Sequence, residues 1–164
     1  MRIYLHKFQR ISWALMGMLI CLSLGAASAT LEFPEGCRPL SVQETLTLEN
    51  NPKQKLILIH NASELMLWLI HSEVTPTPRP WNSHLCQDQW SAVTTNEERF
   101  TLKCIEAKPG AEQVIHCLQA IHACIFDEAQ FSEENQGSYW VSENQALEDL
   151  LKHIKARGIS LHKK

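Results

Sequence analysis

The chain has 164 residues, 45% of them hydrophobic, and 15 Lys and Arg against 18 Asp and Glu, a formal net charge of -3. A mildly acidic chain of this size is a poor candidate for binding nucleic acid or an anionic lipid surface by charge. It contains no G-x-S-x-G and no Gly-rich phosphate loop, so the common motifs of nucleophilic catalysis and phosphate binding are missing.

The first 29 residues have the order of a secretory signal peptide. Three basic residues and no acid lie in residues 1–10, an apolar stretch follows to about Ala26, and Ala27-Ser28-Ala29 are small residues that signal peptidase accepts. The apolar stretch is shorter than the roughly 20 residues of a transmembrane helix. We therefore expect cleavage after Ala29, export from the cytoplasm, and no stable membrane insertion of the mature chain.

The mature chain would start at Thr30. The signal takes away three basic residues and no acid, so 12 basic residues face 18 acidic ones, a net charge of -6. This charge argues further against a nucleic-acid partner. We divide the mature chain into an N-terminal arm, residues 30–54, and one β-rich domain, residues 55–164, whose size is ordinary for a single core.

The first elements are short and β-like. Residues 30–54 are mixed and polar, which predicts an irregular arm with one short strand near 44–48. Residues 55–60 and 65–71 are apolar runs that a short polar turn separates, which predicts a hairpin or neighbouring strands. Three prolines in residues 73–80 exclude a central strand and indicate an extended loop.

The second half of the chain reads as short strands. Residues 81–89 are a loop or an edge segment, and Lys108-Pro109-Gly110 is a turn signal. Alternation of apolar and polar residues and β-rich composition predict the remaining strands. These are residues 90–95, 100–106, 114–117, 120–126 and 138–141.

The C-terminal helix has the clearest signals. Ser142 with Gln145 fits a capping box, and Gly158 fits the position after the last helical turn. Between them, apolar residues recur at helical spacing, at Leu147, Leu150, Leu151 and Ile154. Six or seven strands and one helix predict a mostly β fold, a small antiparallel β-sandwich or partly open barrel with one C-terminal α-helix.

The five cysteines of the mature chain are disulfide candidates, because exported proteins meet an oxidising environment. If the predicted turn forms, Cys104 and Cys117 fall nearly opposite each other, which favours a cross-strand disulfide. The second expected pair is Cys37 with Cys124, although a bond between Cys104 and Cys124 stays open. Cys86 is then the unpaired thiol.

Histidines and cysteines do not form a recognisable chemical motif. No CxxC or HxxxH spacing is present, and histidine is an ordinary residue at strand ends. His84 and Cys86 lack a third group that would orient the histidine as a general base. We therefore predict no catalytic residues, no metal ligands and no cofactor. The pairs His116-Cys117 and His122-x-Cys124 keep a metal-binding or redox protein open as an alternative.

Two tryptophans are the predicted contact residues for a protein partner. Trp81 follows the proline-rich loop, Trp90 lies near a strand end, and exposed aromatic residues often anchor protein interfaces. Asn61-Ala62-Ser63 also matches the sequon for N-glycosylation, which is a weak signal when it occurs once.

Four blocks of residues carry a family resemblance. The first is Ile59-His60-Asn61-Ala62-Ser63 with Leu67-Trp68-Leu69, and the second is Trp81 with Trp90-Ser91-Ala92. The third and most specific is Cys104-Ile105-Glu106-x-Lys108-Pro109-Gly110-x-Glu112-Gln113 with Cys117 and Cys124. The fourth is Tyr139-Trp140-Val141-x-Glu143-Asn144 with Ala156-Arg157-Gly158. Together they resemble the enhanced entry protein B family, small exported proteins of Legionella and related bacteria, over most of residues 57–160.

The resemblance implies a bacterial periplasmic or surface protein that is linked to entry into host cells. It supplies no catalytic residues. Cys86 departs from the family pattern, which puts in doubt a common disulfide scheme that includes this residue.

We therefore expect an exported, non-enzymatic interaction protein of a Gram-negative bacterium. It would lie in the periplasm, be secreted, or sit at the cell surface, with a protein partner in the cell envelope or on the host. A periplasmic inhibitor or regulator of a cell-wall-cleaving enzyme is a second hypothesis, because a rigid disulfide-bonded domain loses little entropy on binding. The metal-binding or redox protein is the third.

Overall fold

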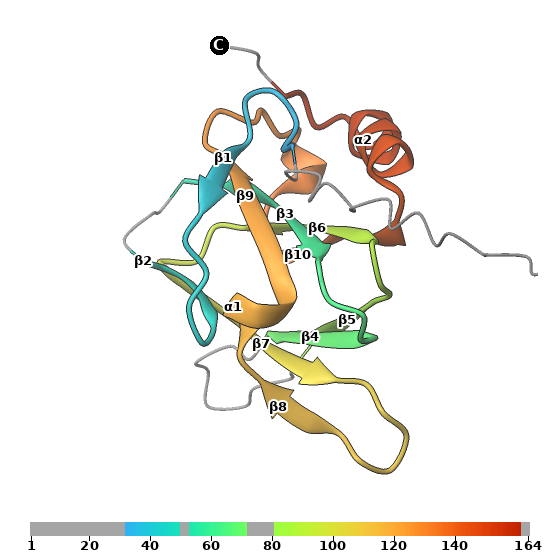
Figure 1. The fold of residues 1–164 in the computed structure, drawn as a ribbon. Coiled ribbons are helices and arrows are strands. Elements are labelled where there is room, and N and C mark those ends of the chain that lie inside the picture. Colours follow the sequence, from blue (N-terminus) through green and yellow to red (C-terminus); the bar gives the residue numbers. More distant parts are fainter. Residues whose placement is uncertain (1–31, 50–52, 72–80, 162–164) are drawn as a thin grey trace, which may run out of the picture. The chain divides into compact units, whose positions relative to one another are not determined.

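The computed structural model describes residues 32–49, 53–71 and 81–161. These residues form two antiparallel sheets that pack face to face, with one C-terminal helix against them (Figure 1). The predicted fold class, a small β-sandwich with a C-terminal helix, is confirmed, and neither sheet closes into a barrel. None of the described helices is long and apolar enough to cross a membrane.

The first sheet, sheet A, has the strand order β1-β9-β3-β6-β10, and all of its neighbours are antiparallel. Its strands are β1 (Arg38–Leu40), β9 (Ile121–Phe126), β3 (Lys55–Asn61), β6 (Trp90–Thr95) and β10 (Tyr139–Gln145).

The second sheet, sheet B, has the order β2-β7-β4-β5, and a short strand β8 pairs with β7 beyond the end of β2. Its strands are β2 (Leu46–Glu49), β7 (Arg99–Glu106), β4 (Leu67–His71), β5 (Trp81–Leu85) and β8 (Gln113–Ile115). The described residues also include three short helical elements, namely α1 (Cys117–Ala120), the 3-10 turn η1 (Glu133–Asn135) and α2 (Leu147–Ala156).

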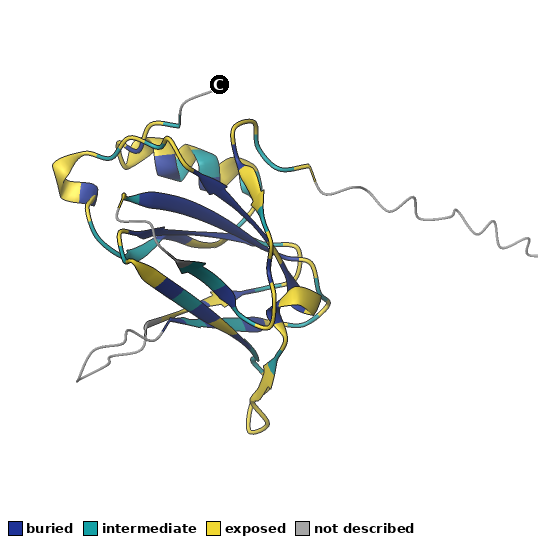
Figure 2. Cartoon of the chain, turned by 90° about the vertical axis from the view of Figure 1, so that its left-hand side faces the viewer, coloured by how far each residue is buried: buried dark blue, intermediate teal, exposed yellow. Residues whose placement is uncertain are grey.

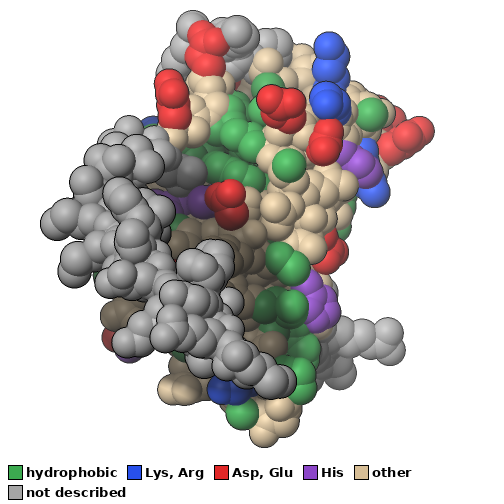
Figure 3. Space-filling model, turned by 45° about the vertical axis from the view of Figure 1, so that its right-hand side comes forward, with side chains coloured by type: hydrophobic (Ala, Val, Ile, Leu, Met, Phe, Trp, Pro, Cys, Tyr) green, Lys and Arg blue, Asp and Glu red, His purple; other side chains and the backbone are tan. Residues whose placement is uncertain are grey.

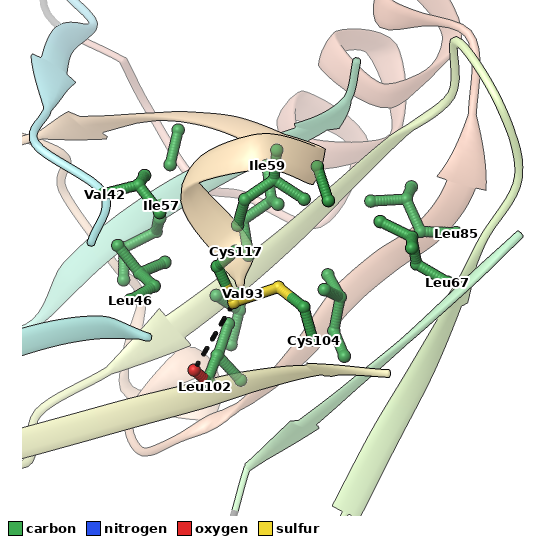
Figure 4. Packing of buried hydrophobic residues seen from close by; sticks show 14 of the residues in the cluster. Val42, Leu46, Ile57, Ile59, Leu67, Leu85, Val93, Leu102, Cys104 and Cys117 are labelled. Atoms are coloured by element: carbon green, nitrogen blue, oxygen red, sulfur yellow. Dashed lines mark hydrogen bonds between the residues drawn. A yellow bond between two sulfur atoms is a disulfide. The ribbon is translucent and has the colours of Figure 1, made fainter. Parts of the chain in front are cut away.

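The main core lies between the two sheets. Successive side chains of a strand point to opposite faces, so Ile57 and Ile59 of β3 face sheet B. Leu67 and Leu69 of β4 meet them from the other side, and all four are fully buried. Figure 4 shows how these side chains pack around the Cys104–Cys117 disulfide.

The outer face of sheet A is also covered. Leu56 and Leu58 point away from sheet B, yet they are fully buried, because α2 and the segment before β1 lie over this face. Leu150 and Ile154 of α2 are fully buried there (Figure 2). This third layer explains why the run at residues 55–60 is apolar at nearly every position instead of alternating.

Two strands expected to be neighbours belong to different sheets. The runs at 55–60 and 65–71 form β3 in sheet A and β4 in sheet B, so the prediction of a hairpin or of adjacent strands was wrong. The amide of Asn61 bridges this crossing, because its Nδ2 donates to the carbonyl oxygens of Leu65 (2.6 Å) and Leu85 (3.0 Å). The described part of residues 30–54 contains β1 and β2, which pair within the two sheets.

The two ends of α2 differ in how well their sequence signals predicted them. Ser142 and Gln145 do not cap the helix; they lie in β10, where Gln145 pairs with Trp90, and Ala146 is the N-cap. The C-terminal signal is confirmed. Gly158 has φ +78°, and the amides of Gly158 and Ile159 bond back to Lys155 and Ile154 in a Schellman arrangement.

Candidate functional site

Two disulfides join the cysteine pairs that the sequence favoured. Cys37 and Cys124 tie the segment before β1 to β9, and their Cα atoms are 5.5 Å apart. Cys104 and Cys117 are also bonded, with Cα atoms 5.3 Å apart. Cys86 is the free cysteine and is partly exposed. Two disulfides fit an oxidising compartment outside the cytoplasm.

The Cys104–Cys117 bond is not a ladder pair, although the hairpin was expected to make it one. Cys104 lies opposite Ile115, β8 ends there, and Cys117 begins α1. Both cysteines are fully buried, so the bond closes the hairpin from within the core (Figure 4). The Cys117 sulfur lies 3.9 Å from the carbonyl oxygen of Leu102, which is a packing contact because a disulfide sulfur carries no proton to donate.

Beyond this disulfide, the β7–β8 hairpin projects from the sandwich (Figures 1 and 2). Its tip is the predicted turn, in which the Ala111 amide donates to the carbonyl oxygen of Lys108 at 2.9 Å. Gly110 has φ +73°, a conformation that favours glycine after Pro109. Residues 108–114 are all exposed. The hairpin is therefore a convex element with solvent around its tip.

Backbone hydrogen bonds hold the base of the hairpin on both sides. The Ala107 amide donates to the carbonyl oxygen of Met66 at 2.8 Å. On the other side, the amides of Cys117 and Leu118 donate to residues 44 and 43, at 3.1 and 2.9 Å. Together with the disulfide, these bonds fix the direction in which the hairpin projects.

Exposed apolar side chains gather at this hairpin. Among the residues that the structure describes, the strongly exposed large hydrophobic side chains are Met66 (50%), Val114 (67%) and Leu118 (66%). Met66 contacts the hairpin base, Val114 is the middle of β8, and Leu118 follows the disulfide. We call Met66 and residues 105–118 the hairpin end. Sequence reasoning missed it, because single apolar residues in short polar stretches carry no periodic signal.

A row of side chains on the outer face of sheet B continues from the hairpin end. The register places Val114 beside Ile105, Ile105 beside Trp68, and Trp68 beside His84. The rings of Trp68 and His84 meet edge to face, with centroids 5.3 Å apart. The Trp68 indole nitrogen is buried without a hydrogen-bond partner among the described residues. The row crosses β8, β7, β4 and β5.

Of the two tryptophans predicted as contact residues, the structure describes the side chain of Trp90 alone, and that side chain is buried. Trp90 is only 4% exposed, because the ring stacks on His60 at 4.7 Å and Phe33 covers it at 6.2 Å. The expectation of an exposed anchor at Trp90 is therefore wrong. Trp81 begins β5 opposite His71, but its side chain lies outside the described residues, as does the loop at 73–80.

Two histidines, His60 and His122, pair across β3 and β9 near one end of sheet A. His60 is buried, its Nε2 lies 3.0 Å from the carboxylate of Asp88, and its Nδ1 has no hydrogen-bond partner among the described residues. The ring of His122 is 6.4 Å from that of His60. Across residues 32–49, 53–71 and 81–161, no group of three or more His, Cys, Asp or Glu could hold a metal. Four of the five cysteines in the described part of the chain are in disulfides, so they supply no thiolate ligands.

A second buried histidine has a structural role. His71 is 1% exposed and stacks on Phe100 with ring centroids 4.4 Å apart. Its Nδ1 donates to the carbonyl oxygen of Thr101 at 2.8 Å, and its Nε2 lies 3.1 Å from the carboxylate of Glu97. His71 thereby joins β4 to β7 and to the β6–β7 connection.

Charged side chains form one partly buried cluster. The Asp127 carboxylate accepts from Arg38 at 2.8 Å and from the buried Lys55 at 3.2 Å. Partial burial raises the pKa of Asp127, but hydrogen bonds and positive charge from Arg38 and Lys55 outweigh it and hold the pKa below its ordinary value of 3.8. Elsewhere, acidic side chains are spread over the upper part of the face in Figure 3 without forming one patch.

The glycosylation sequon is not usable in the folded protein. Asn61 is fully buried, and its Nδ2, the atom that would carry the sugar, donates to the carbonyl oxygens of Leu65 and Leu85. Its Oδ1 accepts from the amide and hydroxyl of Ser63 at 3.0 and 2.7 Å. The motif marks a structural turn at this position.

No protein-family model matches the chain, and no curated protein or solved structure is significantly similar to it.

Proposed function

We propose that the protein is an exported, non-enzymatic interaction protein that binds its partner through the hairpin end. It acts in the periplasm or at the surface of a Gram-negative bacterium, in envelope function or host contact. The observation that carries this proposal is the gathering of Met66, Val114 and Leu118 around one disulfide-closed hairpin. Exposed apolar residues are ordinary when scattered, whereas a cluster on a fixed convex element marks a contact surface.

The hairpin end suits binding because it is ordered before a partner arrives. The disulfide and the three backbone bonds at its base restrict the hairpin in the free protein. Less conformational entropy is then lost on association, so more of the contact energy appears as affinity. The chain's expected role at the cell surface, including entry into host cells, is part of this proposal and rests on the family resemblance and the signal peptide.

Capture of a partner tests the proposal. The mature protein, immobilised with both disulfides formed, is incubated separately with envelope proteins of the producing bacterium and with surface proteins of host cells. We expect Met66→Lys and Leu118→Lys to abolish capture of a protein that the wild type retains. Gln130→Lys makes the same charge change at an exposed position outside the hairpin end and is the control. Equal capture by all three variants would contradict the proposal.

One observation favours a second function, inhibition or regulation of a cell-wall-cleaving enzyme. A convex, disulfide-closed hairpin with an exposed Lys108-Pro109-Gly110 tip has the shape that enters an enzyme cleft. Adding the mature protein to a muramidase assay tests this function. Slower turnover that is restored by replacing Lys108 and Pro109 with Ala supports it, and unchanged turnover removes it.

A further inference from the structure

The short strand β8 is an open sheet edge. Within the described residues it pairs with β7 alone, so its other side presents unpaired backbone amides and carbonyls. Its three residues, Gln113, Val114 and Ile115, carry no charge, and Val114 is 67% exposed. An unpaired edge of this kind is a template for another strand.

The other sheet edges carry features that discourage pairing. In β1, Arg38 and Pro39 provide a charge and a missing amide donor. In β10, two register shifts and the positive φ of Asn144 interrupt the edge. β5 packs beside β10, and the described side chains of β2, residues 46–48, are buried or half-buried. Among the described strands, β8 is the edge with an uncharged, regular backbone and a strongly exposed apolar side chain.

We propose that β8 pairs antiparallel with β8 of a second copy of this chain, across a two-fold axis at Val114. This inference rests on the proposed function and names the partner of the same surface. In that register, Val114 faces Val114 of the copy, and Gln113 faces Ile115. The pairing is isologous, so each contact occurs twice. It extends the three residues of this open edge into a continuous antiparallel ladder.

The charges beside β8 favour a copy of the chain as the occupant. The same register sets Glu112 alongside His116 of the copy on both sides of the axis. His116 already lies 4.0 Å from Glu44 of its own chain, so it can bridge two carboxylates when protonated. An apolar centre with complementary flanks is what a self-pairing strand requires.

Sedimentation velocity of the mature chain over a range of concentrations tests the inference. Both disulfides are kept, and Cys86→Ser removes dimers that form through the free thiol. We expect a concentration-dependent dimer. Val114→Lys places a charge on the axis and should weaken dimerisation by about 30-fold or more, the size of a hot-spot effect. The control Gln130→Lys should dimerise as the wild type does.

A second pair of variants, which exchanges the residues at positions 112 and 116, tests the dimer even if Val114→Lys affects folding. His116→Glu sets two acids beside each other and should weaken the dimer, and adding Glu112→His should restore it. Hydrogen exchange at the amides of residues 113–115 should slow in the dimer. A wild type that stays monomeric, or a dimer unaffected by Val114→Lys, overturns the inference. If the monomer still captures another protein through Leu118, the proposed function stands and only the self-pairing fails.

Discussion

His71 is the buried residue whose polar contacts are easiest to test. Replacing it with Phe keeps the stack on Phe100 but leaves the carbonyl of Thr101 without its donor and removes the contact with the carboxylate of Glu97. A buried acceptor that loses its partner costs about 1–3 kcal/mol. We expect His71→Phe to lower the free energy of unfolding in urea by that amount. His122→Phe, at an exposed position, should change it much less, and equal effects would contradict the structural role of His71.

The Asp127 cluster predicts a pH dependence of stability. The pKa of Asp127 is lower in the folded protein than its ordinary value of 3.8, so the unfolded chain binds the proton more tightly. The stabilisation is present above that ordinary value and is lost as pH falls through the folded pKa. Urea unfolding between neutral pH and pH 3 should show Asp127→Asn well below the wild type at neutral pH, with the difference shrinking in acid.

Lys55 provides the companion variant for that measurement. Its side chain is 7% exposed and bonds to Asp127, so Asp127→Asn leaves a buried ammonium without its carboxylate. Adding Lys55→Met should recover part of the lost stability at neutral pH. A double variant less stable than Asp127→Asn alone would show that Lys55 has another essential role.

The exposure of single side chains could not be predicted from the sequence, whereas the pairing of the cysteines could. Trp90 was expected to be exposed because it begins a strand, but Phe33 and His60 cover it from segments remote in the chain. Val114 and Leu118 were not predicted as contact residues, because their exposure depends on how the hairpin projects from the sandwich, which the local sequence does not show. The cysteine pairs were predictable, because Cys104 and Cys117 flank a clear turn and few alternatives remained for Cys37 and Cys124.

At the scale of elements, the two disulfides should differ in their effect on stability. Cys104–Cys117 spans a sequence separation of 13, and Cys37–Cys124 spans 87. The chain-entropy model gives about 3 kcal/mol for the shorter loop and about 4.5 kcal/mol for the longer one. We expect replacement of Cys37 and Cys124 by Ala to lower the free energy of unfolding more than replacement of Cys104 and Cys117. The opposite order in urea unfolding would refute this prediction.

The positions of the strands along the sequence were predicted better than the pairing between strands. The runs at 55–60, 90–95 and 100–106 became β3, β6 and β7 because β-branched and aromatic residues favour strands wherever they pair. Pairing depends on which sheet a strand joins, and nothing local in residues 62–66 says that the chain crosses there. The capping box at Ser142 failed for a related reason, since pairing of β10 with β6 continues to Gln145.

At the scale of the molecule, the sequence predicted the two packed sheets but not the third layer that covers the outer face of sheet A. Apolar strands predicted a sandwich, but they did not show that α2 and the segment before β1 together cover sheet A. That cover buries Leu56 and Leu58 on the outer face of sheet A, whereas sheet B keeps an outer row that reaches the hairpin end. The asymmetry is consistent with the proposal that sheet B and its hairpin carry the contact surface.

Site-specific photo-crosslinking in the producing bacterium tests the central claim, that the hairpin end is where this protein meets its partner. A photoreactive residue is placed at Leu118 in one strain and at Gln130 in another, and adducts are compared after irradiation. The account predicts a discrete covalent adduct from position 118, to a second copy or to another protein, and none from position 130. Adducts from position 130 with none from position 118 would contradict it.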